Sequence, residues 1–175
     1  MPTVLKSEIT FRGRAFNVRL DEVEYAPGRT HRMEVVEHTG AVTIAPLDHE
    51  GNLWFIRQYR HPVGETILEL PAGTLTPDED PAAGAGRELQ EEIGMRAGTL
   101  EKIGMFYLAP GYSTELMHVY LATDLSPAPL AQDEDELITV EKLPVARALE
   151  LAMRGEVRDA KSLAALFAAS RRLGW

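Results

Sequence analysis

Three glutamates stand close together near the middle of the 175-residue chain, namely Glu88, Glu91 and Glu92. On a helix, Glu88 and Glu92 would lie one turn and about 40° apart on the same face. Two such carboxylates repel each other by a few tenths of a kcal/mol in water, so one interpretation is a solvated acidic face. A hard divalent cation offers another interpretation, because Mg²⁺ and Mn²⁺ prefer oxygen ligands and tolerate this charge density.

The flanking residues predict the helix that would carry these carboxylates, over residues 81–93. Asp80 is a good N-cap, and Pro81 suits the first helical position, where its missing N–H is not needed. Gly94 suits the position just after the end of the helix. The expected core stripe, on a different face from Glu88 and Glu92, consists of Ala82, Leu89 and Ile93.

Glycines in and near this helix also indicate a ligand site. Gly84 and Gly86 would each cost a helix up to about 1 kcal/mol relative to alanine, which predicts that tertiary contacts or a ligand hold the helix. Gly73, at the end of the preceding loop, lets the backbone approach closely. A loop carbonyl and the helix face together would form a metal site.

The rest of the chain predicts a single domain built from a mixed sheet flanked by helices. Period-2 alternation, buried apolar runs and turn signals indicate the strands, and two further helices are expected at 144–155 and from residue 159 or 160 onward. The expected strands cover residues 9–18, 20–25, 33–37, 41–47, 53–59, 66–70, 100–107, 116–122 and 137–143.

Composition narrows the function classes. There are 18 Lys and Arg against 27 Asp and Glu, a net charge of −9, with no cationic run that would bind nucleic acid. The absence of cysteine excludes disulfides and thiolate chemistry. No stretch approaches the roughly 20 apolar residues of a membrane helix, and no secretory core is present. We therefore expect a soluble cytoplasmic protein without a nucleic-acid or membrane partner.

The spacing around the three glutamates resembles the signature of the Nudix hydrolase family at every defined position. The matching residues are Gly73, Glu79, Arg87, Glu88, Leu89, Glu91, Glu92, Gly94 and Met95. The resemblance implies an α/β fold, the Nudix-type α/β/α sandwich with a mixed sheet, and divalent-metal-dependent hydrolysis of nucleoside diphosphates linked to another group. It also implies that Glu88, Glu92 and the carbonyl of Ala72 are metal ligands. Arg87 would orient the cluster, with Glu91 as its ion-pair partner.

Segments outside the signature are similar to those of the ADP-ribose pyrophosphatase subfamily. They cover residues 37–42, 57–60, 69–73 and 109–115, the last of which contains Pro110. This resemblance implies that Arg60 binds a phosphate, for which the guanidinium fork is suited. It also implies that Arg32 and Glu34 contact the adenosine end. The alternatives are a strand-end cation for Arg60 and a surface salt bridge for the other two.

An acidic run, residues 133–136, precedes the last expected strand. Its position resembles the loop in which the subfamily keeps a catalytic glutamate, which would make Glu134 the general base and Glu136 a further metal ligand. Four consecutive acids also permit a slip of one or two residues, and a solvated acidic loop is the alternative.

Together these expectations predict hydrolysis of ADP-ribose to AMP and ribose 5-phosphate with Mg²⁺, or alternatively Mn²⁺. Another nucleoside diphosphate sugar, such as a GDP-sugar, is the alternative substrate. A non-catalytic nucleotide sensor is disfavoured because every signature carboxylate is kept, and an EF-hand calcium site because its loop is missing. The resemblance further predicts a homodimer, with residues 1–38 as a dimerising β extension and residues 39–175 as the Nudix domain.

Overall fold

The computed structural model describes residues 1–131 and 137–175. The chain divides into two compact units. The first comprises Met1–Gly40 and Phe106–Leu116, and the second comprises Ala41–Met105 and Met117–Trp175. No helix in the described part of the chain is long and apolar enough to cross a membrane.

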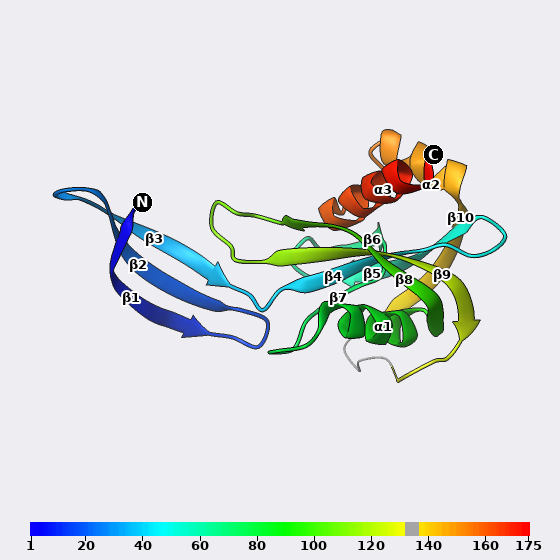
Figure 1. Ribbon diagram of the computed structural model, residues 1–175, viewed down its shortest axis with the longest axis horizontal. Helices are drawn as coiled ribbons and strands as arrows, with labels where there is room; N and C mark the ends of the chain where they lie inside the picture. Colours follow the sequence, from blue (N-terminus) through cyan, green and yellow to red (C-terminus); the bar gives the residue numbers. More distant parts are fainter. Residues whose placement is uncertain (132–136) are drawn as a thin grey trace. The chain divides into compact units, whose positions relative to one another are not determined.

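The first unit is an antiparallel three-stranded sheet of β1 (Thr3–Arg12), β2 (Asn17–Ala26) and β3 (Arg29–Glu37), in that order (Figure 1). The segment 106–116 joins this unit through β3. The Val36 N–H donates to the Tyr112 carbonyl at 2.7 Å, and the Thr114 N–H donates to the Val36 carbonyl at 2.9 Å. This sheet is the predicted N-terminal β extension.

The first strand boundary differs from the sequence prediction. A single strand over residues 9–18 was expected, but a hairpin turn separates β1 from β2 within that range. The Gly13 N–H donates to the Phe16 carbonyl at 3.0 Å across this turn. A Cβ at Gly13 would lie 2.8 Å from the Phe16 oxygen, so glycine allows the tight closure. The alternating pattern continues on both sides of the turn and hides it.

The second unit contains two sheets. Their strand orders are β10-β5-β6 and β7-β4-β9-β8, and β4 runs antiparallel to β7 but parallel to β9. All six residues of β4 are buried, as expected for a strand covered on both faces. The strands are β4 (Ala41–Pro46), β5 (Asn52–Arg60), β6 (Glu65–Glu69), β7 (Ala72–Thr74), β8 (Met95–Tyr107), β9 (Leu116–Pro127) and β10 (Ile138–Pro144).

Three helices complete the described part of this unit. Helix α1 (Pro81–Glu92) lies on one side of the strands, and α2 (Val145–Met153) and α3 (Ala160–Leu173) lie on the other (Figure 1). The α/β/α sandwich with a mixed sheet is therefore confirmed. Its core beneath α1 is formed by Val42, Ile44, Ile56, Leu75, Ala85, Leu89, Ile93, Tyr120 and Ala122.

The predicted ends of α1 are present. The Asp80 carboxylate accepts from the N–H groups of Ala82 and Ala83 at 3.0 and 3.1 Å. Gly94, just after the C-cap residue, has φ +68°. One detail was wrong, because Ala82 is exposed and Ala85 takes its place in the core. Ala82 lies in the capped first turn, where a favourable angle on the wheel does not by itself bury a side chain.

Candidate active site

Two buried carboxylates of α1 lie against the short strand β7. Glu88 is 7% exposed and Glu92 is 1% exposed. The Ala72 N–H donates to Glu92 Oε2 at 2.9 Å, which ties the end of the helix to the start of β7. Figure 1 shows β7 beside α1. The structure thus brings together Ala72, Glu88 and Glu92, the three predicted metal ligands that lie within its described residues.

Gly73 gives the Glu88 carboxylate the room it occupies. A Cβ at Gly73 would lie 1.9 Å from Glu88 Oε1 and 2.4 Å from Oε2. Any side chain here would displace the carboxylate, since atoms cannot approach so closely. The first glycine of the signature is therefore required by packing against a carboxylate 15 positions later in the chain.

Arg87 is the centre of an ion-pair cluster on the same helix. Its Nη1 lies 2.7 Å from Glu88 Oε1 and donates to Glu91 Oε2 at 2.7 Å. Its Nε and Nη2 donate to the two oxygens of Glu79 at 3.0 and 3.2 Å. The bonds to Glu79 raise the pKa of Arg87, against the opposing effect of burial. The expected pair with Glu91 is present, and the same guanidinium holds Glu88 in place.

Glu79 was a signature position without an assigned role. Besides Arg87, it accepts the Thr76 N–H at 2.9 Å. The bond from Arg87 is the largest effect that lowers the Glu79 pKa, and burial opposes it. A Cβ at Gly84 would lie 3.3 Å from the Glu79 Cδ. Glu79 therefore links the loop before α1 to Arg87. In the sequence, only the spacing of Glu79 from Arg87 in the signature indicated that Glu79 belongs to the site.

Arg60, the predicted phosphate ligand, is the last residue of β5 and forms an ion pair with the buried Glu69. Its Nε and Nη2 donate to Glu69 Oε1 and Oε2 at 2.7 and 2.8 Å. This bidentate pair raises the Arg60 pKa despite partial burial, and the charge of Glu92 adds to the rise. Arg60 is thus paired with Glu69 and also experiences the charge of Glu92, one of the predicted metal ligands.

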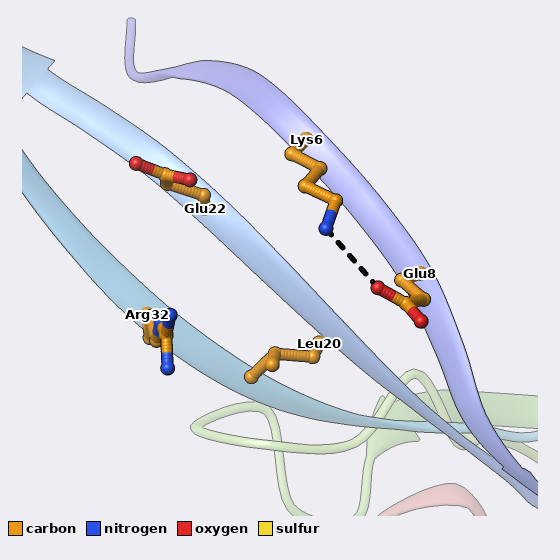
Figure 2. A pocket seen from close by; sticks show the side chains of 5 residues that line it. All are labelled: Lys6, Glu8, Leu20, Glu22 and Arg32. Carbon is orange, nitrogen blue, oxygen red and sulfur yellow. Dashed lines mark hydrogen bonds and ion pairs between the residues drawn. The ribbon is translucent and has the colours of Figure 1, made fainter.

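Arg32 and Glu34, predicted at the adenosine end, lie on β3 of the first unit. Arg32 is opposite Glu22 and Glu34 is opposite Leu20 in the sheet register. Arg32 lines a small cavity of about 60 Å³. Figure 2 shows the other residues that line it, namely Lys6, Glu8, Leu20 and Glu22. The substrate role of Arg32 and Glu34 stays a prediction.

Glu134 and Glu136, the predicted general base and further metal ligand, lie outside the described residues. Among residues 1–131 and 137–175, no three acidic or histidine side chains gather closely enough to hold a cation. Glu88 and Glu92 would therefore need other oxygen donors to complete a metal site, as the sequence prediction supposes.

The carboxylates of α1 nevertheless fit a divalent cation by their chemistry. Glu88 and Glu92 are both nearly inaccessible and both face the backbone of β7. Glu88 occupies the space that a side chain at Gly73 would fill. Glu88 shares the guanidinium of Arg87 with Glu79 and Glu91, so this ion-pair cluster carries excess negative charge. Buried carboxylates are normally paired or coordinate metals, and all-oxygen donors suit Mg²⁺ or Mn²⁺.

Comparison with known proteins agrees with this site. The NUDIX domain model matches residues 37–166, which include the signature, Arg60 and the sandwich as far as the first half of α3. The chain therefore belongs to the Nudix family, and its fold and signature are those of a Nudix hydrolase that depends on a divalent metal.

Two curated relatives and one solved structure are similar over nearly the whole chain. ADP-ribose pyrophosphatase of Bacillus subtilis (strain 168) is 39% identical over 94% of this chain and 89% of its own length. ADP-ribose pyrophosphatase of Mycobacterium tuberculosis is also 39% identical, over 94% of this chain and 81% of its own. A crystal structure of an ADP compounds hydrolase superposes with a TM-score of 0.89 at 30% identity, covering 99% of this chain and 94% of that one.

Proposed function

We propose that this enzyme hydrolyses the diphosphate bond of ADP-ribose, releasing AMP and ribose 5-phosphate. The observation that carries the proposal is the pair of buried carboxylates, Glu88 and Glu92, held against Ala72 and Gly73 within the family signature. The substrate is supported by relatives named ADP-ribose pyrophosphatase, which are similar over 89% and 81% of their own lengths.

Glu88, Glu92, Glu136 and the Ala72 carbonyl are the residues that would hold the metal, and Mg²⁺ is the proposed ion, with Mn²⁺ as the alternative. When bound, divalent cations neutralise a diphosphate and lower the pKa of a bound water. Arg87 keeps Glu88 in place through the ion pair at 2.7 Å. The bond from Ala72 keeps Glu92 turned towards β7.

The remaining steps fall to other side chains. Arg60 would bind a phosphate oxygen and hold the diphosphate for in-line attack by water, a positioning effect that contributes strongly to catalysis. Glu134 would accept the proton of that water as general base. Arg32 and Glu34 would bind the adenosine end. No covalent intermediate with the protein is required.

A hydrolysis screen over nucleoside diphosphate sugars, with chromatographic identification of the products, tests this function. We expect ADP-ribose to give the highest kcat/KM, with AMP and ribose 5-phosphate as products. A higher kcat/KM for a GDP-sugar would establish the alternative substrate class. Binding without turnover of any nucleotide would identify a sensing module and contradict the proposal.

We further propose that residues 1–38 mediate a homodimer and that residues 39–175 carry the catalytic Nudix domain. Phe11 and Phe16 on the extension are 55% and 43% exposed, so a single chain leaves them largely uncovered. Burying such side chains against a second copy would be favourable, and it would protect the edge of the sheet. Light scattering at micromolar concentration should give twice the 19.4 kDa of one chain; the mass of one chain would contradict the dimer.

A further inference from the structure

A buried ion network connects Arg60 to the last helix of the fold. Glu69, at the end of β6, has 0% exposure. It accepts both bonds from Arg60 described above, and its Oε2 also accepts from the ammonium of Lys161 on α3. The Lys161 side chain is only 13% exposed. The fully buried carboxylate of Glu69 therefore pairs with two cations that lie far apart in the sequence, Arg60 on β5 and Lys161 on α3.

The start of α3 is fixed to the same place by a second set of bonds. Asp159, the N-cap of α3, lies 3.0 Å from the Lys161 ammonium and accepts the Ser162 N–H at 3.0 Å. The Ser162 hydroxyl in turn accepts the N–H of Leu70, the residue after Glu69, at 2.7 Å. These bonds hold Lys161 and Glu69 together whether or not Arg60 is present.

Exposure within this network follows a clear order. Glu69 is inaccessible, Lys161 and Asp159 are each 13% exposed, and the Arg60 side chain is 36% exposed. The four formal charges sum to zero, which suits a buried network. Among the described residues, the Arg60 guanidinium donates hydrogen bonds through Nε and Nη2 alone, both to Glu69. Glu69 thus binds the Nε and Nη2 edge of the guanidinium, and Nη1 can donate to another partner.

We infer that Glu69 and Lys161 are positioning residues that fix the Arg60 guanidinium for a phosphate oxygen of the substrate, an inference that rests on the proposed function. A bidentate carboxylate fixes the plane of a guanidinium. An arginine that is already held loses less rotamer freedom when it binds an anion. Lys161 keeps Glu69 ionised and oriented, and so acts on the substrate through Arg60.

Lys161→Met tests the inference, because it removes the ammonium while keeping an apolar side chain of similar length. We expect KM for ADP-ribose to rise by about tenfold and kcat to fall by a smaller factor, since a less firmly held Arg60 binds the phosphate more weakly. Arg158→Met is the matched control. Arg158 also pairs with β6, through Glu65, but both of these side chains are more than half exposed, so KM should stay unchanged.

A double-mutant cycle with Arg60→Met separates positioning from general damage. If Lys161 acts through Arg60, adding Lys161→Met to Arg60→Met should raise KM no further. An equal rise in both backgrounds would overturn the inference, as would a Lys161→Met enzyme with the KM of the wild type. If Lys161→Met fails to fold, Glu69→Gln combined with Lys161→Met removes both buried charges and should give the same rise in KM.

A second readout is independent of turnover. The Nε–H of Arg60 should give a protected signal in ¹⁵N NMR spectra of the wild type, because it donates to a buried carboxylate. Lys161→Met should shift and broaden that signal, and Arg158→Met should not. An unshifted signal would overturn the positioning role, whereas a wild type without ADP-ribose hydrolysis but with the expected shift would refute only the proposed function. An Arg60→Met enzyme with unchanged KM would refute the phosphate role of Arg60, and the inference with it.

Discussion

The carboxylate of Glu88 occupies the space that a side chain at position 73 would fill, and Gly73 leaves that space open. A Cβ at position 73 would lie 1.9 Å from Glu88 Oε1, far inside any allowed contact. The first and middle parts of the Nudix signature are thus linked by packing, in addition to their expected shared role in metal binding. The glycine is needed for the room it leaves beside β7.

Gly73→Ala should therefore disable the enzyme without unfolding it. The added methyl group would push the Glu88 carboxylate away from β7, and a misplacement of about 1 Å can reduce the rate by about 100-fold. Steady-state kinetics and a thermal melt would measure the two effects separately. Gly86→Ala is a suitable control, since nothing lies within 4 Å of the added atom. Near-normal kcat in Gly73→Ala would show that the position of Glu88 is not critical.

The two glycines inside α1 should respond to alanine in opposite ways. Gly86 faces open space, so Gly86→Ala should stabilise the protein by about 0.5–1 kcal/mol through helix propensity and reduced freedom of the unfolded chain. At Gly84 a Cβ would lie 2.5 Å from the Leu75 Cδ2 in the core, so Gly84→Ala should destabilise. Urea denaturation of both variants would check the signs. Equal shifts would mean that the space around Gly84 adapts.

The acidic run at residues 133–136 can be assigned by comparing charge-removing variants. Glu134→Gln should lower kcat with little change in substrate affinity, because a general base acts on the proton of the attacking water. Glu136→Gln should mainly raise the Mg²⁺ concentration needed for half-maximal rate. Normal turnover by Glu134→Gln together with an inactive Asp133→Asn would show that the resemblance is displaced by one residue.

Much of the site could be predicted from the sequence because helix caps and helical spacing depend only on residues that are close together in the chain. Asp80 and Gly94 marked the ends of α1, and the spacing of Glu88 and Glu92 placed both on one face. β7 was not predicted, since three residues are too few to show alternation. The partnership of Glu69 with Lys161 spans 92 positions, and no periodic pattern reports a contact of that separation. The hairpin turn at Gly13 was concealed by alternation that continues across it.

Stability should depend on pH through Glu69. Burial alone would raise the Glu69 pKa, but the bonds from Arg60 and Lys161 outweigh it and hold the pKa below its ordinary value. A carboxyl whose pKa is lowered by folding stabilises the protein above the pKa of the unfolded chain. That contribution is lost as the pH falls from about 5 towards the folded value.

Glu69→Gln isolates this contribution. The variant should be less stable than the wild type at pH 7 by about 3 kcal/mol, because the largely buried Lys161 and the partly buried Arg60 lose their carboxylate. Its free energy of unfolding should fall less steeply below about pH 5. Urea titrations across this range would measure both properties. Parallel pH profiles for the two proteins would contradict the assignment.

The buried carboxylates of α1 are expected to hold the metal on which ADP-ribose hydrolysis depends. The most direct test of this claim is the rate of AMP release by Glu92→Gln as a function of Mg²⁺, compared with Glu101→Gln, which makes the same change at an exposed ion pair with Arg172. We predict that kcat of Glu92→Gln at saturating Mg²⁺ is lower by about 10³-fold or more. Its stability should be equal or higher because repulsion with Glu88 is relieved. Glu101→Gln should match the wild type, whereas near-normal AMP release by Glu92→Gln would contradict the claim.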